Sequence, residues 1–113
     1  MTRIHSYLIF GGNCRAAMSF YHECLGGELT LRTLGESPLS KKMPKQMKEC
    51  ILHATLIKDA LVLQGSDMVP QNGLIKGNTI SLSLDCSSEE EIKEVYKKLS
   101  ADGRADHPLK DTF

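Results

Sequence analysis

An internal repeat of a strand–helix–strand pattern constrains the fold of this chain more than any other feature of its sequence. The predicted elements of the two copies are, in order, a strand over 4–10, a helix over 13–25 and a strand over 28–34, then a strand over 78–84, a helix over 88–99 and a strand over 104–109. Each copy of a repeat usually forms one supersecondary unit. Two further apolar segments, near 50–57 and 60–64, follow only the first copy. We therefore expect an α+β fold of paired βαβββ modules, with the second module apparently truncated after its second strand.

Length and charge favour one soluble globular domain over 1–113. Within it we expect module one over 1–67, a linker over 68–77 and an incomplete module two over 78–113. Fourteen basic residues balance fourteen acidic ones, so no net field favours nucleic acid or a membrane surface. No apolar run approaches the roughly 20 residues that span a bilayer, and the first residues lack a signal-peptide pattern. We expect a cytoplasmic protein that binds neither nucleic acid nor membranes.

The four cysteines are predicted to be reduced and partly buried. They are Cys14, Cys24, Cys50 and Cys86. None forms a C-x-x-C pair, and no histidine stands at zinc-finger spacing from them. In a cytosolic chain such thiols usually behave as small apolar side chains.

Local signals define the ends of both predicted helices. Asn13 is a good N-cap for the first helix, and Gly26-Gly27 can end it in the left-handed conformation. The second helix begins with a capping box, in which Ser88 is followed by Glu91. The expected buried stripes are Ala17, Phe20, Tyr21 and Cys24 on the first helix and Ile92, Val95, Tyr96 and Leu99 on the second.

The residues that follow the first copy predict a polar loop and then a hairpin. Residues 35–49 are polar and contain a proline, which favours a loop. The strands near 50–57 and 60–64 are joined by Lys58-Asp59, which has the length of a two-residue hairpin turn.

Strand alternation predicts a polar, ligand-binding cleft. In the expected strand 78–84, three apolar residues face one way and three hydroxyl residues face the other. If the sheet curls, the hydroxyl groups join polar side chains of the first module, and such a cleft suits a small molecule. The candidate ligand-binding residues are His5, Tyr7, His53, Gln64, Thr79, Ser81 and Ser83.

Other interpretations of the two histidines remain open. His5 stands near a strand start and could simply be exposed, and His53 could be a buried histidine hydrogen-bonded to a neighbour. The sequence contains neither Ser-His-Asp spacing nor a phosphate-binding glycine loop. A zinc-like cation needs three or four convergent ligands, and two histidines without carboxylates on inward positions do not make a convincing metal site. We expect no tightly bound structural metal, although a divalent metal remains an alternative, and no catalytic residue is assigned.

Several motifs resemble PhnB-like proteins of the vicinal oxygen chelate superfamily, which includes glyoxalases, bleomycin-resistance proteins and dioxygenases. The segments that carry the resemblance are 7–14, Ala17, Phe20-Tyr21, 25–28, His53-Ala54, 65–67, 77–84 and 107–113, which together cover essentially the whole chain. The resemblance implies paired βαβββ modules, each a curved half-barrel, usually assembled as dimers. We therefore expect a homodimer.

The resemblance also implies where a metal site would lie. In metal-using relatives, ligands come from the first and last strands of each module. By position, His5 matches the first ligand, Thr79 stands at the second, and Leu63 or Gln64 stands where a carboxylate would be. The last ligand would lie beyond Phe113, where the family pattern continues with two closing strands.

Three functions follow as alternatives. The first is a metal-dependent lyase, dioxygenase or transferase acting on a small oxygen-bearing substrate. The second is a non-catalytic binding protein that, as the resemblance to drug-resistance relatives implies, sequesters a small planar or oxyanionic molecule between two protomers. The third is a non-catalytic structural dimer. The incomplete ligand set favours the binding protein or the structural dimer. Some relatives carry the label 3-demethylubiquinone 3-methyltransferase, but the sequence lacks a glycine-rich nucleotide-binding turn.

Overall fold

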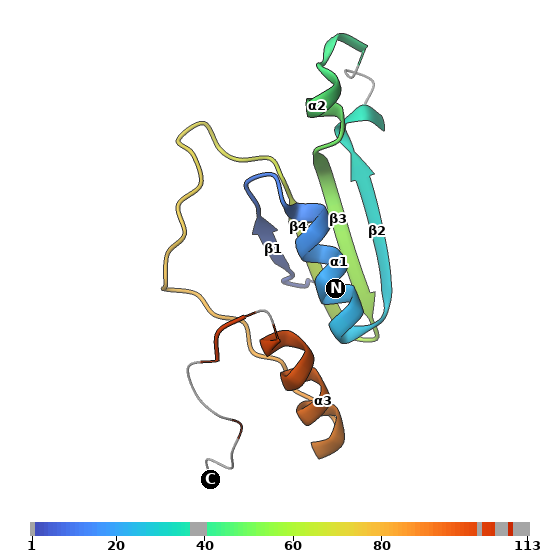
Figure 1. The fold of residues 1–113 in the computed structure, drawn as a ribbon, viewed down its shortest axis with the longest axis vertical. Helices are drawn as coiled ribbons and strands as arrows, with labels where there is room; N and C mark the ends of the chain where they lie inside the picture. Colours follow the sequence, from blue (N-terminus) through green and yellow to red (C-terminus); the bar gives the residue numbers. More distant parts are fainter. Residues whose placement is uncertain (1, 37–40, 102, 106–108, 110–113) are drawn as a thin grey trace. The chain divides into compact units, whose positions relative to one another are not determined.

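The chain divides into two compact units, Met1–Lys76 and Gly77–Phe113. The structure, a computed structural model, describes residues 2–36, 41–101, 103–105 and 109. Figure 1 traces the elements of both units along the chain. The boundary between the units falls at the end of the expected linker.

The first unit is an α+β module built on a four-stranded mixed sheet. Its elements are β1 (Ser6–Ile9), α1 (Cys14–Leu25), β2 (Glu28–Thr33), the short 3-10 helix η1 (Leu34–Glu36), α2 (Lys45–Lys48), β3 (Ile51–Lys58) and β4 (Leu61–Ser66). The strand order is β1-β4-β3-β2, with β1 parallel to β4 and the other neighbours antiparallel. The predicted strands and first helix of this module are confirmed. The described part of the expected loop over 35–49 includes the end of η1 and all of α2.

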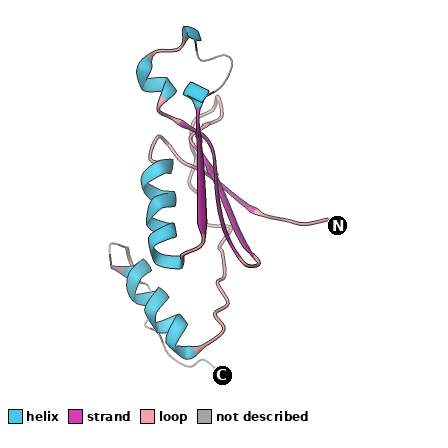
Figure 2. Cartoon of the chain, turned by 90° about the vertical axis from the view of Figure 1, so that its right-hand side faces the viewer, coloured by secondary structure: helices cyan, strands magenta, loops and turns pink. Residues whose placement is uncertain are grey.

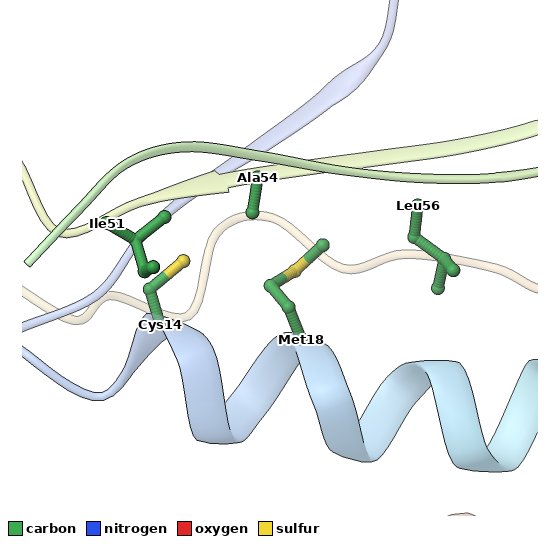
Figure 3. Packing of buried hydrophobic residues seen from close by; sticks show 5 residues of the cluster. All are labelled: Cys14, Met18, Ile51, Ala54 and Leu56. Atoms are coloured by element: carbon green, nitrogen blue, oxygen red, sulfur yellow. The ribbon is translucent and has the colours of Figure 1, made fainter. Parts of the chain in front are cut away.

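Helix α1 covers one face of this sheet and forms the core with β3. Figure 2 shows the helix against that face, and Figure 3 shows the buried side chains pointing toward one another. Sheet side chains alternate between faces, so Ala54 and Leu56 of β3 meet the helix, and Ile51 meets it before the break in the register. The fully buried cluster consists of Cys14, Met18, Ile51, Ala54 and Leu56.

The buried stripe of α1 is rotated from the predicted one. Of the predicted residues, Cys24 is buried, Tyr21 packs against the core, and Ala17 and Phe20 are half-buried. Gly65 explains the rotation. A Cβ on this glycine would stand 3.2 Å from Sδ of Met18 and 3.3 Å from Sγ of Cys14. The bare backbone of β4 therefore lets these two helix residues approach the sheet most closely.

At the start of α1, the side chain of Asp67 accepts the capping hydrogen bonds that were predicted for Asn13. Asn13 occupies the N-cap position, but its side chain makes no capping hydrogen bond. The backbone N–H groups of Gly12 and Cys14 donate to Oδ1 of Asp67 at 3.1 and 3.0 Å, and the N–H of Ile51 donates to Oδ2 at 2.8 Å. One buried carboxylate thus joins the start of the helix to the start of β3. Helix N-termini favour such negative charge.

The β3–β4 hairpin has the expected length, but its turn is displaced by one residue. Lys58 pairs with Leu61, so the turn consists of Asp59 and Ala60 rather than Lys58 and Asp59. Asp59 has a φ of 52°. Aspartate tolerates this left-handed conformation better than most residues, which places it at the first turn position.

The second unit contains the predicted helix, here α3 (Glu89–Ser100). The capping box is confirmed, because the N–H of Glu91 donates to the Ser88 hydroxyl at 3.0 Å. Two exposed ion pairs at i,i+4 spacing, Glu89–Lys93 and Glu94–Lys98, lie along the helix. Its apolar stripe is less buried than predicted. Val95, Tyr96 and Leu99 are half-buried, and Ile92 is 38% exposed.

The predicted strand over 78–84 is also wrong for this structure. The segment has no regular secondary structure, and Ile80 and Leu82 are 84% and 58% exposed. A strand exists only through hydrogen bonds to a neighbour, and no described residue pairs with this segment. Residues 103–105 and 109 form no strand, and the rest of the predicted strand over 104–109 lies outside the described residues. Among the described residues, the predicted second βαβββ module is therefore represented by its helix.

None of the helices in the described part of the chain is both long and apolar enough to cross a membrane.

Candidate ligand-binding face

The face of the sheet opposite α1 carries three of the polar side chains that the sequence singled out. Ala54 and Leu56 point toward the helix, so His53 and Thr55 belong to the opposite face. Within the described part of the first unit, no helix covers this face (Figure 2). We call it the open face and define it by Tyr7, Thr30, Arg32, His53, Thr55 and Gln64.

Tyr7 and His53 form an aromatic pair on the open face. Their ring centroids lie 5.8 Å apart with an interplanar angle of 38°. Tyr7 comes from β1 and His53 from β3, and β4 runs between these two strands. Neighbouring strands are about 4.8 Å apart, so both side chains lean over β4 to meet. Tyr7 is 49% exposed, which leaves part of the pair accessible to solvent.

Gln64 and Thr55 complete a polar row across the sheet. Gln64 of β4 is in register with Tyr7 on one side and with Thr55 on the other. The Thr55 hydroxyl lies 3.3 Å from Nδ1 of His53, and the tautomer of the ring decides which of the two donates. This contact orients the imidazole and leaves Nε2 for another partner. Thr55 was missed by the sequence analysis, although it stands two residues after His53 in an alternating strand.

Arg32 of β2 is in register with His53 and was also missed. The next registered pair is Thr33 with Ile51, so β3 carries one extra residue, Leu52, at this point. Such a bulge bends a strand and changes the direction of the adjacent side chain. The alternation of β2 would have placed Arg32 and Thr30 on one face. The cross-strand register that brings Arg32 opposite His53 has no local sequence signal.

The structure brings three of the seven predicted site residues together. These are Tyr7, His53 and Gln64. His5 precedes β1 and is exposed. The remaining three, Thr79, Ser81 and Ser83, are exposed residues of the second unit, and their role in binding stays a prediction.

Of the two residues considered for the last-strand ligand position, Gln64 alone lies on the open face. Leu63 packs against the core instead. In the part of the chain that the structure describes, no three His, Cys, Asp or Glu side chains gather in a group that could hold a metal ion.

The buried thiol of Cys14 lies on the helix side of the sheet. Burial, together with the negative charge of Asp67, raises the pKa of Cys14 from 9.0 to about 11. The thiol therefore stays protonated at neutral pH and is a poor nucleophile. This agrees with the expectation of a structural cysteine.

Comparisons with known proteins agree on one family. A model of the family described as 3-demethylubiquinone-9 3-methyltransferase matches residues 2–112. Protein YjdN of Escherichia coli (strain K12) is 31% identical over an alignment of length 116 that covers 95% of this chain and 78% of YjdN.

Two solved structures share the fold. Protein PA1353 from Pseudomonas aeruginosa superposes with a TM-score of 0.75 at 38% identity, over 99% of this chain and 82% of that one. A putative 3-demethylubiquinone-9 3-methyltransferase, the PhnB protein from Bacillus cereus, superposes with a TM-score of 0.71 at 27% identity, over 96% of this chain and 81% of that one.

Proposed function

Because the chain belongs to the PhnB-like family described as 3-demethylubiquinone-9 3-methyltransferase, we propose that it binds a small molecule on the open face of its sheet. The observation that carries the proposal is the Tyr7–His53 ring pair. Both residues lie on the face that α1 leaves uncovered, with Gln64 in register beside Tyr7. Small-molecule sites combine aromatic surface with a few polar groups in this way.

The chemistry of the pair suits reversible binding. The phenol of Tyr7 offers an apolar ring with a polar tip, which can both stack on a ligand and form a hydrogen bond. The imidazole of His53 can donate or accept a hydrogen bond, and the Thr55 hydroxyl lies 3.3 Å from its Nδ1. Gln64 adds an amide that both donates and accepts. These groups provide recognition on four neighbouring positions of one rigid sheet.

A thermal-shift screen of small molecules, followed by affinity measurements on variants, tests the proposal. His53→Ala and Tyr7→Phe should each weaken the binding of a hit by about five- to tenfold, the effect of losing one ring or hydrogen-bond contact. Tyr21→Phe is the matched control, because this tyrosine packs against the core on the other side of the sheet. Unchanged affinity in both open-face variants would place the site elsewhere.

A further inference from the structure

We propose that the ligand of the open face is a planar monoanion and that Arg32 binds its anionic group. This inference rests on the proposed function and specifies the chemical class of the ligand. Its starting observation is that β2 places Arg32 directly opposite His53 of β3.

The register brings the guanidinium within reach of the ring pair. Residues directly opposite each other on one face of an antiparallel pair have Cβ atoms about 4.5–5.5 Å apart. The bulge at Leu52 changes the direction of the strand at this pair. The arginine side chain is exposed, so its guanidinium can turn toward a molecule that rests on His53.

The charge of Arg32 is available for a ligand. Within the described part of the chain, no carboxylate forms an ion pair with it; both ion pairs there belong to α3. Glu28 shares the strand and the face, but it stands four residues away, or about 13 Å at the usual rise of a strand. A carboxylate ligand would therefore meet one unpaired guanidinium, whose fork of donors matches both of its oxygens.

The Tyr7–His53 ring pair favours a ligand that contains a flat ring. The two rings, tilted by 38°, present aromatic surface over β4. Arg32 lies on the far side of His53 from Tyr7, because the strand order is β1-β4-β3-β2. A molecule with one flat ring and one carboxylate would stack on the ring pair while its carboxylate reaches Arg32. The hydroxyl of Thr55 and the amide of Gln64 would contact substituents of the ring.

Benzoate and its neutral isostere benzamide separate the anionic contribution from stacking. In amide NMR titrations of the full chain, benzoate should shift the signals of residues 7, 32, 53 and 55. Benzamide should bind the same place about fivefold or more weakly, since a charge-assisted bidentate contact contributes more than a neutral one. Arg32→Gln should remove the preference for benzoate, and Arg32→Lys should keep part of it. Arg15→Gln, on the exposed side of α1, is the matched control and should change nothing.

The outcomes distinguish this inference from the proposed function. Equal affinities for the two probes, an unchanged preference in Arg32→Gln, or no shift by benzoate at millimolar concentration would overturn the planar-anion assignment. Binding of benzamide at the ring pair would then still support the proposed function. If every molecule from the thermal-shift screen shifted signals away from Tyr7 and His53, the proposed function itself would fail.

Discussion

The sequences of the two units predict the same strand–helix–strand pattern, but the units differ in the contacts that stabilise these elements. In the first unit, β1, α1 and β2 are joined by β3 and β4, and residues such as Met18 and Leu56 are fully buried. In the second unit, α3 is the one regular element among the described residues, 78–84 is irregular, and no residue of α3 is fully buried. Both copies have the alternation or periodicity that predicts their elements. The difference shows that a pattern becomes a strand only when another strand pairs with it.

Helices and strands depend on their surroundings to different degrees. Helix α3 is supported by contacts a few residues apart, namely the Ser88 cap and two i,i+4 ion pairs. The segment 78–84 also contains apolar residues, but it could form a strand only by pairing with another strand that is distant in the sequence. The packed sheet that stabilises the protein therefore belongs to the first unit, and so does the open face.

The largest expected effect comes from Asp67, the carboxylate that joins distant parts of the first unit. Asp67→Ala leaves three backbone N–H groups without their acceptor. Orphaned buried donors cost about 1–3 kcal/mol each, so we expect a loss of about 3–5 kcal/mol in unfolding free energy. Urea denaturation followed by circular dichroism measures it. Asp85→Ala, at an exposed position of the second unit, is the control and should cost less than about 0.5 kcal/mol.

Truncating one leucine in each unit sharpens the comparison directly. Leu56→Ala opens a cavity beneath α1 and should lower the unfolding free energy by about 2–5 kcal/mol. Leu82→Ala removes a side chain that is 58% exposed and should change it by less than about 0.5 kcal/mol. The same denaturation experiment measures both variants. Similar losses in the two would show that 78–84 is packed in solution, against this account.

Removing the side chain at the N-cap position should destabilise α3 and have a much smaller effect on α1. Ser88→Ala removes the hydroxyl that accepts from the N–H of Glu91, at an expected cost of about 1 kcal/mol in helix stability. Asn13→Ala is the matched variant, and it should cost only a few tenths, because Asp67 serves the start of α1 instead. Faster amide exchange at Glu91 reports the first effect. A larger cost for the Asn13 variant would contradict the assignment of the cap to Asp67.

A smaller effect should appear at alkaline pH. The pKa of Cys14 is raised from 9.0 to about 11, so folding favours the protonated thiol. Its contribution to stability is fully present below pH 9.0 and is lost as the pH rises toward 11. Stability should therefore fall more steeply over this range in the natural chain than in Cys14→Ala. Equal slopes of unfolding free energy against pH would show that this thiol does not titrate with folding.

Much of the first unit could be predicted because its signals are local. The alternation around Tyr7, the glycines after Leu25 and the hairpin spacing after His53 located the strands and helix to within a few residues. The rotation of α1 could not be predicted, because it depends on the contact of Met18 with Gly65, far away in the sequence. The role of Asp67 was missed for the same reason, since its donors lie up to 55 residues away.

The candidate site was predicted in part. Tyr7, His53 and Gln64 were found from strand alternation, which fixes the face of each residue once the strand is known. Thr55 followed the same alternation and could have been included. Arg32 could not have been placed beside His53, because cross-strand register depends on pairing and on the bulge at β3. The expected strand over 78–84 failed because alternation does not reveal whether a partner is present.

Amide hydrogen exchange, resolved residue by residue by NMR, tests most directly the claim that the stable sheet and its open face belong to the first unit. Amides that hydrogen-bond within β3 and β4 should exchange about a thousandfold or more slowly than an unstructured chain, because they open only with the core. Amides of 78–84 should exchange within about tenfold of the unstructured rate, since no described strand pairs with them. Protection in 78–84 comparable to that in β3 would contradict the account.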